Sequence, residues 1–563
     1  MWVKDEAWRL GLPAFKVLGA SWATYRLLEQ RRGATFEPWS SIADLRDRVA
    51  ELALGPRRSK VKTRFGTAGA PAPSPAALSK GPGSRRSEVK PRFGTAGAPA
   101  SSPAALSPDR FGSTDWLRAT VSRFVEGPAH ARRRALVEEE LSAMSPLDLR
   151  RSARRRGPID ALALALGVHA GSVTDAVAAV AIVANGYPSS ARAADQAAAD
   201  SAVATLIELV GPQAGDEERL AARISVLVQS HDATIALIDG VNVPVPALHR
   251  RGPNGEHVVI DVAACGQDLM FGGGRRPCPG REQALALVDG TADRRRADAF
   301  RAMHHGDRPL VLPNAWDVAS ASALVVRGFG AVGTTSLGVA AAIGLPDGAA
   351  QTLGPTLELA RRLGRLPVPV SVDFEGGFHG DPAGVADLIE RLADMGIVGV
   401  NLEDGLADGS LQSVEHHAAV VTAVKDRCPH VFVNARTDTH WPVPGRVVPD
   451  VDETRRRVQA YVVAGADGVF VPGLEGTEAL RMIVAAVPSV PVNVLWSPDG
   501  PSVAELGDLG VRRVSLGSLL FRVGLGAAVD AADAIATDAE VPLPDRLPAY
   551  ADIQAASRPA TAP

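Results

Sequence analysis

Short apolar runs alternate with amphipathic stretches of roughly 10–15 residues over the C-terminal half of this chain. Each run is nearly continuous in Val and other apolar residues, as in a strand that is covered on both faces. The eight runs are 309–317, 330–336, 367–376, 398–405, 430–438, 466–474, 490–496 and 511–518. Eight strand–helix units over residues 293–545 predict an α/β fold, a closed parallel (β/α)₈ or TIM barrel. An open doubly wound sheet is the alternative, because the pattern does not show closure.

Polar side chains stand at the carboxyl ends of these runs, where the reactive groups of such barrels lie. Asp373 and Glu375 end the third run, Glu403 ends the fourth, and Arg436 ends the fifth. Carboxylates that converge on one mouth repel one another unless a cation lies among them, and oxygen ligands favour Mg²⁺ or Mn²⁺. Arg436 suits a small anionic substrate, since its guanidinium holds two oxygens of a carboxylate or phosphonate. The set predicts stabilisation of a developing enolate oxygen; a structural network of strand-end caps and salt bridges is the alternative.

The strings LPNAWD, TTSLGVAAAIGLPDG, VDFEGG, GVNLEDG, FVNARTD and PVNVL follow one another within this region. In this order and spacing they resemble the isocitrate lyase and phosphoenolpyruvate mutase superfamily. The resemblance implies a (β/α)₈ barrel, often with an exchanged last helix, and a homo-oligomer. It also implies Mg²⁺ and an enolpyruvate-like intermediate, made as a C–C or P–C bond next to a 2-oxo acid breaks or forms.

The resemblance implies roles for the residues that end the third, fourth and fifth runs. Asp373 matches the carboxylate that binds the metal directly, and Glu375 and Glu403 match carboxylates that hold it through water. Arg436 matches the arginine that binds the substrate carboxylate.

Further residues match positions around the substrate in the same family. Thr335 and Ser336 fall where backbone amides and a hydroxyl hold the pyruvyl end, and Asp347 matches an acidic residue near the reacting centre. Asn434 and Asn493 are expected to bind substrate, although either side chain could instead fix strand-end backbone.

The loop after the fourth run, EDGLADGSLQSVEHH, departs from the family pattern. The family's lyases carry a catalytic Cys beside Lys, Gly and His there, and its mutases and hydrolases carry Lys and often Asn. This loop offers only Asp408, Ser410, His416 and His417 as proton carriers, and both histidines are expected on a solvated helix face. A Mg-dependent lyase or phosphonomutase-like hydrolase that cleaves a small 2-oxo or 2-hydroxy carboxylic acid, such as an oxaloacetate-like acid, through a metal-bound enolate fits better than isocitrate lyase, methylisocitrate lyase or true phosphonomutase activity.

Residues 110–290 are Ala-rich with helical patterns and one extended piece at 257–264. The string FGGGRRPCPGREQALALVDG places Cys278 in a Gly-rich turn before a helix. Such a turn lets a thiolate project under a flat macrocycle, and a Cys ligand donates electrons strongly to haem iron. The spacing resembles the haem-binding loop of the cytochrome P-450 family. This resemblance implies haem as a second cofactor, with His130 and Arg134 at the propionates.

The middle segment also departs from that family. It has about half the usual length, it lacks the Glu–Arg pair that braces the haem loop, and Ala233 stands where the proton-delivering Thr should be. These losses bear on monooxygenase turnover more than on haem binding, so the segment is expected to be a reduced haem-thiolate domain. A free thiol in an ordinary Gly-rich turn is the alternative for Cys278.

A duplication marks the segment before these two regions, residues 58–109. VKTRFGTAGAPAPSPAALS at 61–79 returns as VKPRFGTAGAPASSPAALS at 89–107. This composition cannot bury a core, which predicts a disordered linker; a docking motif on the Arg-Phe-Gly triplets is the alternative. Residues 1–57 form an uncharacterised helical segment and 546–563 a disordered tail, so the chain is expected to be multidomain.

Composition excludes several partners and settings. The 60 Lys and Arg against 63 Asp and Glu leave a net charge of −3, which argues against a nucleic-acid partner. The five arginines of 150–156 are expected on a solvated helix face or near haem propionates. Three Cys exclude a disulfide framework, and no apolar run reaches the roughly 18 residues of a membrane span. A charged N-terminus, MWVKDEAWRL, is no secretory signal, so a cytoplasmic location is expected.

Three functions fit these observations. The first is the lyase barrel fused to a degenerate haem-binding domain. The second is a haem-thiolate oxidoreductase or haem sensor, monooxygenase-like and iron-binding, with the barrel as partner enzyme; a haem absorbance band would distinguish it. The third is a non-catalytic fusion scaffold that recruits a partner through the repeated linker.

Overall fold

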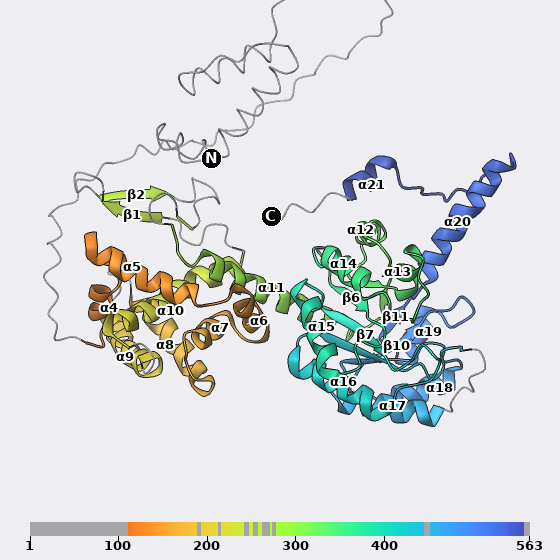
Figure 1. Ribbon diagram of the computed structural model, residues 1–563, viewed down its shortest axis with the longest axis horizontal. Coiled ribbons are helices and arrows are strands. Elements are labelled where there is room, and N and C mark those ends of the chain that lie inside the picture. The colour runs from red at the N-terminus through yellow and green to blue at the C-terminus, as the bar shows by residue number, and fades with distance from the viewer. Residues whose placement is uncertain are drawn as a thin grey trace, which may run out of the picture. The chain divides into compact units, whose positions relative to one another are not determined.

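The computed structural model describes residues 111–187, 193–211, 215–240, 247–251, 257–261, 271–272, 277–443 and 451–556 (Figure 1). The predicted N-terminal segment and the repeated linker lie outside these residues. Within the described part of the chain, no helix combines the length and the apolar character needed to cross a bilayer.

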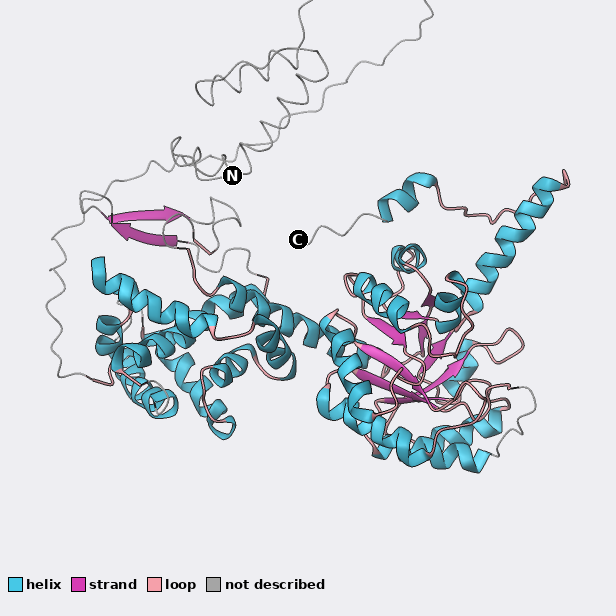
Figure 2. Cartoon of the chain, viewed as in Figure 1, coloured by secondary structure: helices cyan, strands magenta, loops and turns pink. Residues whose placement is uncertain are grey.

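The C-terminal region forms a parallel sheet surrounded by helices (Figure 2). Its nine strands are β3 (Leu310–Leu312), β4 (Asn314–Ala315), β5 (Val332–Thr334), β6 (Val370–Asp373), β7 (Gly399–Glu403), β8 (Phe432–Arg436), β9 (Gly468–Phe470), β10 (Val492–Leu495) and β11 (Arg513–Ser515). Their order is β3-β11-β10-β9-β8-β7-β6-β5-β4, so the two ends of the sheet are consecutive in the chain. Pro313 separates β3 from β4, because proline has no N–H for the ladder. The predicted barrel is therefore confirmed, and its first predicted run is two short strands.

Helices connect the strands and cover the outside of the barrel (Figure 1). They are α12 (Val318–Val326), α13 (Ser336–Ala342), α14 (Leu353–Leu363), α15 (Pro382–Asp394), α16 (Val414–Arg427), α17 (Val451–Val463), α18 (Thr477–Ala486) and α19 (Val503–Asp508). A further helix, α20 (Leu519–Ala536), follows the last strand and extends away from the barrel (Figure 1). Val372, Val400 and Val433, from three adjacent strands, are fully buried in the main apolar cluster. Side-chain caps fix several helix starts: the carboxylate of Asp317 accepts a hydrogen bond from the Ser320 N–H (2.7 Å) at the start of α12.

The residues before the barrel form a helical segment with its own apolar core. Its helices are α4 (Thr114–Thr120), α5 (Gly127–Ser142), α6 (Pro146–Arg155), α7 (Pro158–Ala165), α8 (Val173–Gly186), α9 (Ala193–Val210), α10 (Glu217–Ile238) and α11 (Arg281–Met303). Short 3₁₀ turns lie at Ser122–Phe124 and Ala170–Ser172. Strand β1 (Ala247–Arg251) pairs antiparallel with β2 (His257–Asp261), which lies in the predicted extended piece. The predicted mainly helical character is confirmed.

Helix α11 runs through the boundary that the sequence predicts between the helical segment and the barrel, near residues 290–293. Gly290 does not end the helix, because it lies directly against α6: a β-carbon there would overlap the carbonyl oxygen of Arg150. Further along the same helix Phe300 packs with Phe432 of the barrel, their ring centroids 5.5 Å apart. One continuous helix therefore contributes to both cores.

The arginine run is a solvated face only in part: Arg155 and Arg156 are exposed, whereas Arg154 is buried, which corrects the prediction for that residue. Arg154 has a side chain only 1% exposed, and it bridges Asp293 of α11 (3.1 Å) and Asp394 of α15 (3.3 Å). Its partners lie far along the chain, so the sequence pattern did not reveal them. Buried arginine of this kind is stable only when it is paired.

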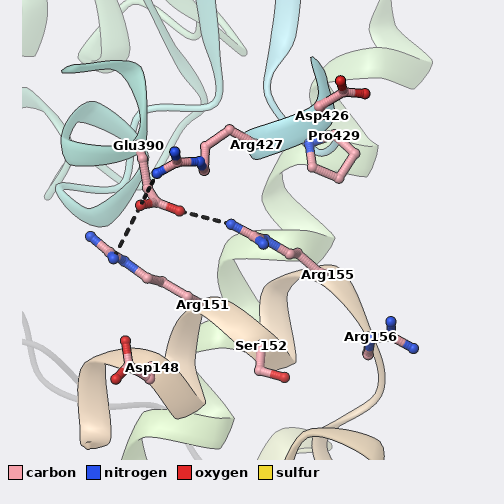
Figure 3. Close-up of a pocket in the computed structure, with 9 residues that line it drawn as sticks. All are labelled: Asp148, Arg151, Ser152, Arg155, Arg156, Glu390, Asp426, Arg427 and Pro429. Carbon is pink, nitrogen blue, oxygen red and sulfur yellow. Dashed lines mark hydrogen bonds and ion pairs between the residues drawn. The ribbon is translucent and has the colours of Figure 1, made fainter. Parts of the chain in front are cut away.

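A cavity of about 790 Å³ opens beside these ion pairs (Figure 3). Glu390 of α15 lies between three of its arginines, pairing with Arg155 (2.7 Å), Arg151 (3.1 Å) and Arg427 (3.6 Å). Its lining holds four arginines, Arg151, Arg155, Arg156 and Arg427, against the three carboxylates of Asp148, Glu390 and Asp426, so ion pairs offset part of the positive charge. The residues that the sequence singles out for catalysis lie at the carboxyl ends of the strands instead.

The C-terminal residues differ in part from the predicted disordered tail. Residues Tyr550–Ala556 form a helix, α21, which contacts α12. Residues 557–563 lie outside the described part.

Candidate active site at the barrel mouth

Asp373, at the end of β6, is held from the neighbouring strand. Its backbone N–H donates to the Thr334 hydroxyl oxygen (2.9 Å), and its carboxylate accepts from the Ser336 backbone N–H (3.2 Å). The Asn401 amide adds a long contact of 3.5 Å. The structure thus brings together Asp373 and Ser336, and places Thr335 between Ser336 and the end of β5.

Glu375 lies two residues further, in a strained backbone conformation. Its φ of 44° falls in the left-handed region, which is uncommon for residues other than glycine and clusters at functional sites. The buried carboxylate accepts from the Ala350 N–H (3.2 Å) and from the Thr352 hydroxyl. Ala350 itself has a φ of 53°. The loop before α14 therefore fixes the Glu375 carboxylate, and no sequence pattern marks Thr352 as one of its donors.

Asp347 lies in the same loop, between α13 and α14. Burial raises the pKa of its carboxyl above the ordinary value; the hydrogen bond from Ser336 and the charge of Arg436 oppose the shift, and the charge of Asp373 adds to it. The Asp347 carboxyl is thus coupled electrostatically to Asp373 and Arg436.

Arg436 ends β8 between two carboxylates. Its Nη1 pairs with Glu403 at the end of β7 (2.7 Å). Its Nε and Nη2 both donate to Asp438, at 2.6 and 3.1 Å. Asp438 was visible in the sequence as a strand-end residue, but its pairing with Arg436 was not foreseen. The spacing was the available signal, because residues two apart in an extended chain point to the same side.

Aromatic rings also contact Arg436. The guanidinium carbon lies 5.2 Å from the ring centroid of Trp441 and 5.8 Å from that of Phe470. Such cation–π contacts hold a guanidinium plane in place. Trp441 comes from the loop after β8, and sequence reasoning missed it.

Negative charge exceeds positive charge at this mouth. Burial raises the pKa of Glu403 well above its ordinary value; Arg436 opposes this shift, whereas the charges of Asp438, Asp373 and Glu375 add to it. Burial likewise raises the pKa of Glu375. Carboxylates that repel one another in a poorly hydrated site are stabilised by a cation.

The donor set fits a hard divalent cation such as Mg²⁺ or Mn²⁺, because every candidate ligand is a carboxylate oxygen. Within the described residues, no group of three or more His, Cys, Asp or Glu side chains is arranged to enclose a metal ion. The predicted roles of Asp373 as a direct ligand, and of Glu375 and Glu403 as ligands through water, stay predictions.

The two asparagines lie deeper in the barrel. The Asn434 amide donates to Asn401 (2.8 Å), and the Asn493 amide donates to the Ser515 hydroxyl (3.0 Å). Both are buried, and Arg513 also donates to Asn401 (3.1 Å). The predicted part of these asparagines in substrate binding stays a prediction, since their described partners are other residues of the barrel interior.

In the loop after β7, polar groups form hydrogen bonds with one another. The exposed Asp408 carboxylate accepts from the backbone N–H and hydroxyl of Ser410, at 2.9 and 2.6 Å. His416 and His417 lie on α16, as predicted. His417 is buried against the ring of Tyr461 (4.6 Å between centroids), so the predicted solvated face is wrong for it.

The residues predicted to bind haem receive no support. Cys278 is exposed, and its backbone N–H donates to the carbonyl of Phe271 (2.7 Å). Arg134, on α5 with His130, pairs with Glu138 (2.7 Å). Residues 273–276 lie outside the described part, and the haem-thiolate domain stays a prediction.

Comparisons with known proteins match the barrel. The phosphoenolpyruvate phosphomutase family matches residues 300–536. An uncharacterized protein of Mycobacterium tuberculosis is 44% identical over 257 residues, 46% of this chain and 95% of that protein. An oxaloacetate decarboxylase of Ectopseudomonas mendocina is 29% identical over 247 residues, 41% of this chain and 81% of that protein. A phosphoenolpyruvate phosphomutase structure from Streptomyces platensis subsp. rosaceus aligns with 46% of this chain and 95% of that one, at 25% identity and a TM-score of 0.42.

Proposed function

Residues 300–536 of the chain belong to the phosphoenolpyruvate mutase/isocitrate lyase superfamily, and on that premise we propose that the barrel is a divalent-metal-dependent lyase. Its substrate would be a small 2-oxo or 2-hydroxy dicarboxylate, such as an oxaloacetate-like acid. In a 2-oxo diacid the C3–C4 bond to the distal carboxylate would break, carbon dioxide would leave, and the bonding electron pair would pass into the enolate of the remaining 2-oxo acid. The oxaloacetate decarboxylase relative supports this class of substrate.

One observation carries the proposal. Asp373, Glu375 and Glu403 come from the ends of two adjacent strands, and their carboxylates interact electrostatically with one another and, through Glu403, with Arg436. A set with this excess of carboxylate cannot attract an anionic substrate by itself. A divalent cation held by these carboxylates would offset their charge, and Arg436 would then bind the substrate anion.

The chain's own residues divide the work. Arg436 would bind the substrate carboxylate, and the Ser336 hydroxyl would hold the pyruvyl end, because the backbone N–H groups of Thr335 and Ser336 already donate to Ala315 and Asp373. A bound Mg²⁺ or Mn²⁺ would supply Lewis-acid stabilisation of the developing negative charge on oxygen. Asp347, with its raised pKa and its hydrogen bond from Ser336, is the candidate to hold a proton near the reacting carbon.

Calorimetric titration of oxalate, with and without Mg²⁺, tests this function. Oxalate mimics the planar pyruvate enolate, so it should bind tightly to the full chain only when Mg²⁺ is present. Asp373→Ala should abolish that binding. Asp452→Ala is the matched control, because Asp452 is an exposed carboxylate on α17 that pairs with Arg455. Absence of oxalate binding to the wild-type chain in Mg²⁺ would reject the enolate site.

We also propose that the barrel assembles with a second copy of this chain. Helix α20 extends away from the barrel (Figure 1) and exposes Val523, Leu525, Val529 and Ile535. A helix with so much exposed apolar surface is expected to be covered by a partner. Light scattering of the wild-type chain should report a dimer or larger, and Val529→Glu should lower the molar mass. A monomeric wild-type chain would exclude this assembly.

A further inference from the structure

Asp404 follows the last residue of β7 and is completely buried. Four donors surround its carboxylate: the Thr437 hydroxyl (2.8 Å), the Asp438 backbone N–H (2.8 Å), the Arg457 guanidinium (2.9 Å) and the Tyr461 hydroxyl (2.7 Å). The donors come from the end of β8 and from α17. One side chain thus ties the strand end that carries Arg436 to an outer helix.

Burying the charged Asp404 carboxylate costs free energy. A buried carboxylate needs a full set of hydrogen bonds, and well-packed apolar residues of similar volume are often equally stable or more so. What a carboxylate adds is direction, because each of its bonds fixes the position of a donor. Among the four donors, the backbone N–H of Asp438 belongs to the residue that contacts Arg436 at the mouth of the barrel.

The Asp438 carboxylate in turn fixes the orientation of Arg436. It accepts from Nε (2.6 Å) and Nη2 (3.1 Å), which together form one edge of the guanidinium. Gly405 makes room for this carboxylate, since a β-carbon at that position would overlap Asp438 Oδ2. With that edge taken, Arg436 can meet a ligand only through the hydrogens that remain on Nη1 and Nη2.

The same cluster also holds the end of the loop that follows β7. Arg457 donates to the carbonyl oxygen of Gln412 (2.9 Å), and the Gln412 N–H donates to the backbone carbonyl of Asp404 (2.8 Å). The loop end and the strand end therefore share one anchor.

We propose that Asp404, held by Arg457 and Tyr461, is a positioning residue that acts through Asp438 to orient Arg436 toward the substrate carboxylate. The proposal rests on the proposed function, in which Arg436 binds that carboxylate. It assigns substrate positioning to α17, a helix that lies outside the mouth.

Tyr461→Phe gives the cleanest test, because it removes the hydroxyl that donates to Asp404 and accepts from Arg457 without changing any charge. Oxalate affinity in saturating Mg²⁺ should fall three- to ten-fold, while Mg²⁺ affinity stays within two-fold of wild type. Tyr187→Phe is the matched control: Tyr187 is also buried, and its hydroxyl has no hydrogen-bond partner among the described residues. It should leave both affinities unchanged.

Asp404→Asn gives the stronger perturbation, because its amide would turn an N–H group toward at least one of the present donors. Oxalate affinity should fall more than ten-fold with Mg²⁺ affinity again retained; if this variant does not fold, Tyr461→Phe still decides the question. A merely structural role would lower both affinities together or neither. If wild type binds oxalate and Tyr461→Phe binds it equally well, the positioning role is wrong and the proposed function stands. If wild type does not bind oxalate, the proposed function itself fails.

Discussion

Replacing Arg436 by methionine should destabilise the barrel strongly. The side chains of Arg436, Glu403 and Asp438 are 11%, 12% and 7% exposed, so water barely reaches the three charges. Methionine keeps most of the apolar stem but leaves both carboxylates without their shared cation. Removing one partner of a buried ion pair costs about 3–5 kcal/mol, so the free energy of unfolding at pH 7 should fall by that amount.

The loss should depend on pH in a defined direction. Without the guanidinium, the pKa values of Glu403 and Asp438, already raised by burial, rise further above their unfolded values. The folded variant then binds more protons than the unfolded chain at neutral pH. Its deficit relative to wild type should therefore shrink as pH falls through the folded pKa values toward those of ordinary carboxyl groups.

Urea unfolding followed by tryptophan fluorescence, at pH 7.5 and at pH 5.5, measures both effects. Arg361→Met is the matched control, since Arg361 is about half exposed and pairs with Glu358 on the surface of α14. This control should lose far less stability and no pH-dependent part. Equal losses for the two variants, or a deficit of Arg436→Met that grows on acidification, would refute the reasoning.

Three further outcomes are expected. Burial lowers the pKa of His304 to about 3. The stability that its neutral ring contributes is therefore present above the unfolded pKa of 6.5 and is lost as pH falls toward 3. His304→Phe keeps the stacking on Phe432, so in urea titrations this variant should lose less stability between pH 7 and pH 5 than wild type does. Gly405→Ala should displace Asp438 and cost about 1–3 kcal/mol of unfolding free energy, with weaker oxalate binding by calorimetry. Because burial raises the pKa of Glu403, Mg²⁺ affinity should fall as pH is lowered, and calorimetry in two buffers of different ionisation enthalpy should detect proton release on binding.

The barrel was predictable because a strand buried on both faces leaves a continuous apolar run. The run at 398–405, for example, contains β7, Gly399–Glu403. The break of the first run at Pro313 was not predicted, although a proline inside an apolar run is the signal for it. The boundary near residues 290–293 failed for a different reason. Whether a glycine ends a helix depends on what packs against it. Gly290 contacts α6, and this tertiary contact cannot be read from the local sequence.

Strand direction predicts only the part of the candidate site that lies at the strand ends. Parallel strands end at the same edge, so Asp373, Glu403 and Arg436 had to be neighbours. Thr352 and Trp441 reach the site from loops, and no local pattern fixes where a loop returns. Likewise, the charges of the arginine run were visible, but not that Arg154 meets Asp394 across 240 positions of the chain.

The loop after β7 limits which bond cleavage the site can perform. Cleaving a 2-hydroxy diacid requires a base to take the hydroxyl proton as the C–C bond breaks, and this loop has neither Cys nor Lys. Decarboxylation of a 2-oxo diacid needs no such base: the bond to the distal carboxylate breaks, its electron pair passes into the enolate, carbon dioxide leaves, and water later protonates the carbon. In the proposed function, the carboxylates of the mouth would hold the cation that stabilises the enolate, and Arg436 would bind the substrate carboxylate. We therefore expect Mg²⁺-dependent release of carbon dioxide from oxaloacetate, measured by coupled assay above the rate of free Mg²⁺, and much slower turnover of 2-hydroxy diacids. Faster turnover of the 2-hydroxy acids would mean that another residue, with Asp347 the first candidate, performs the proton transfer.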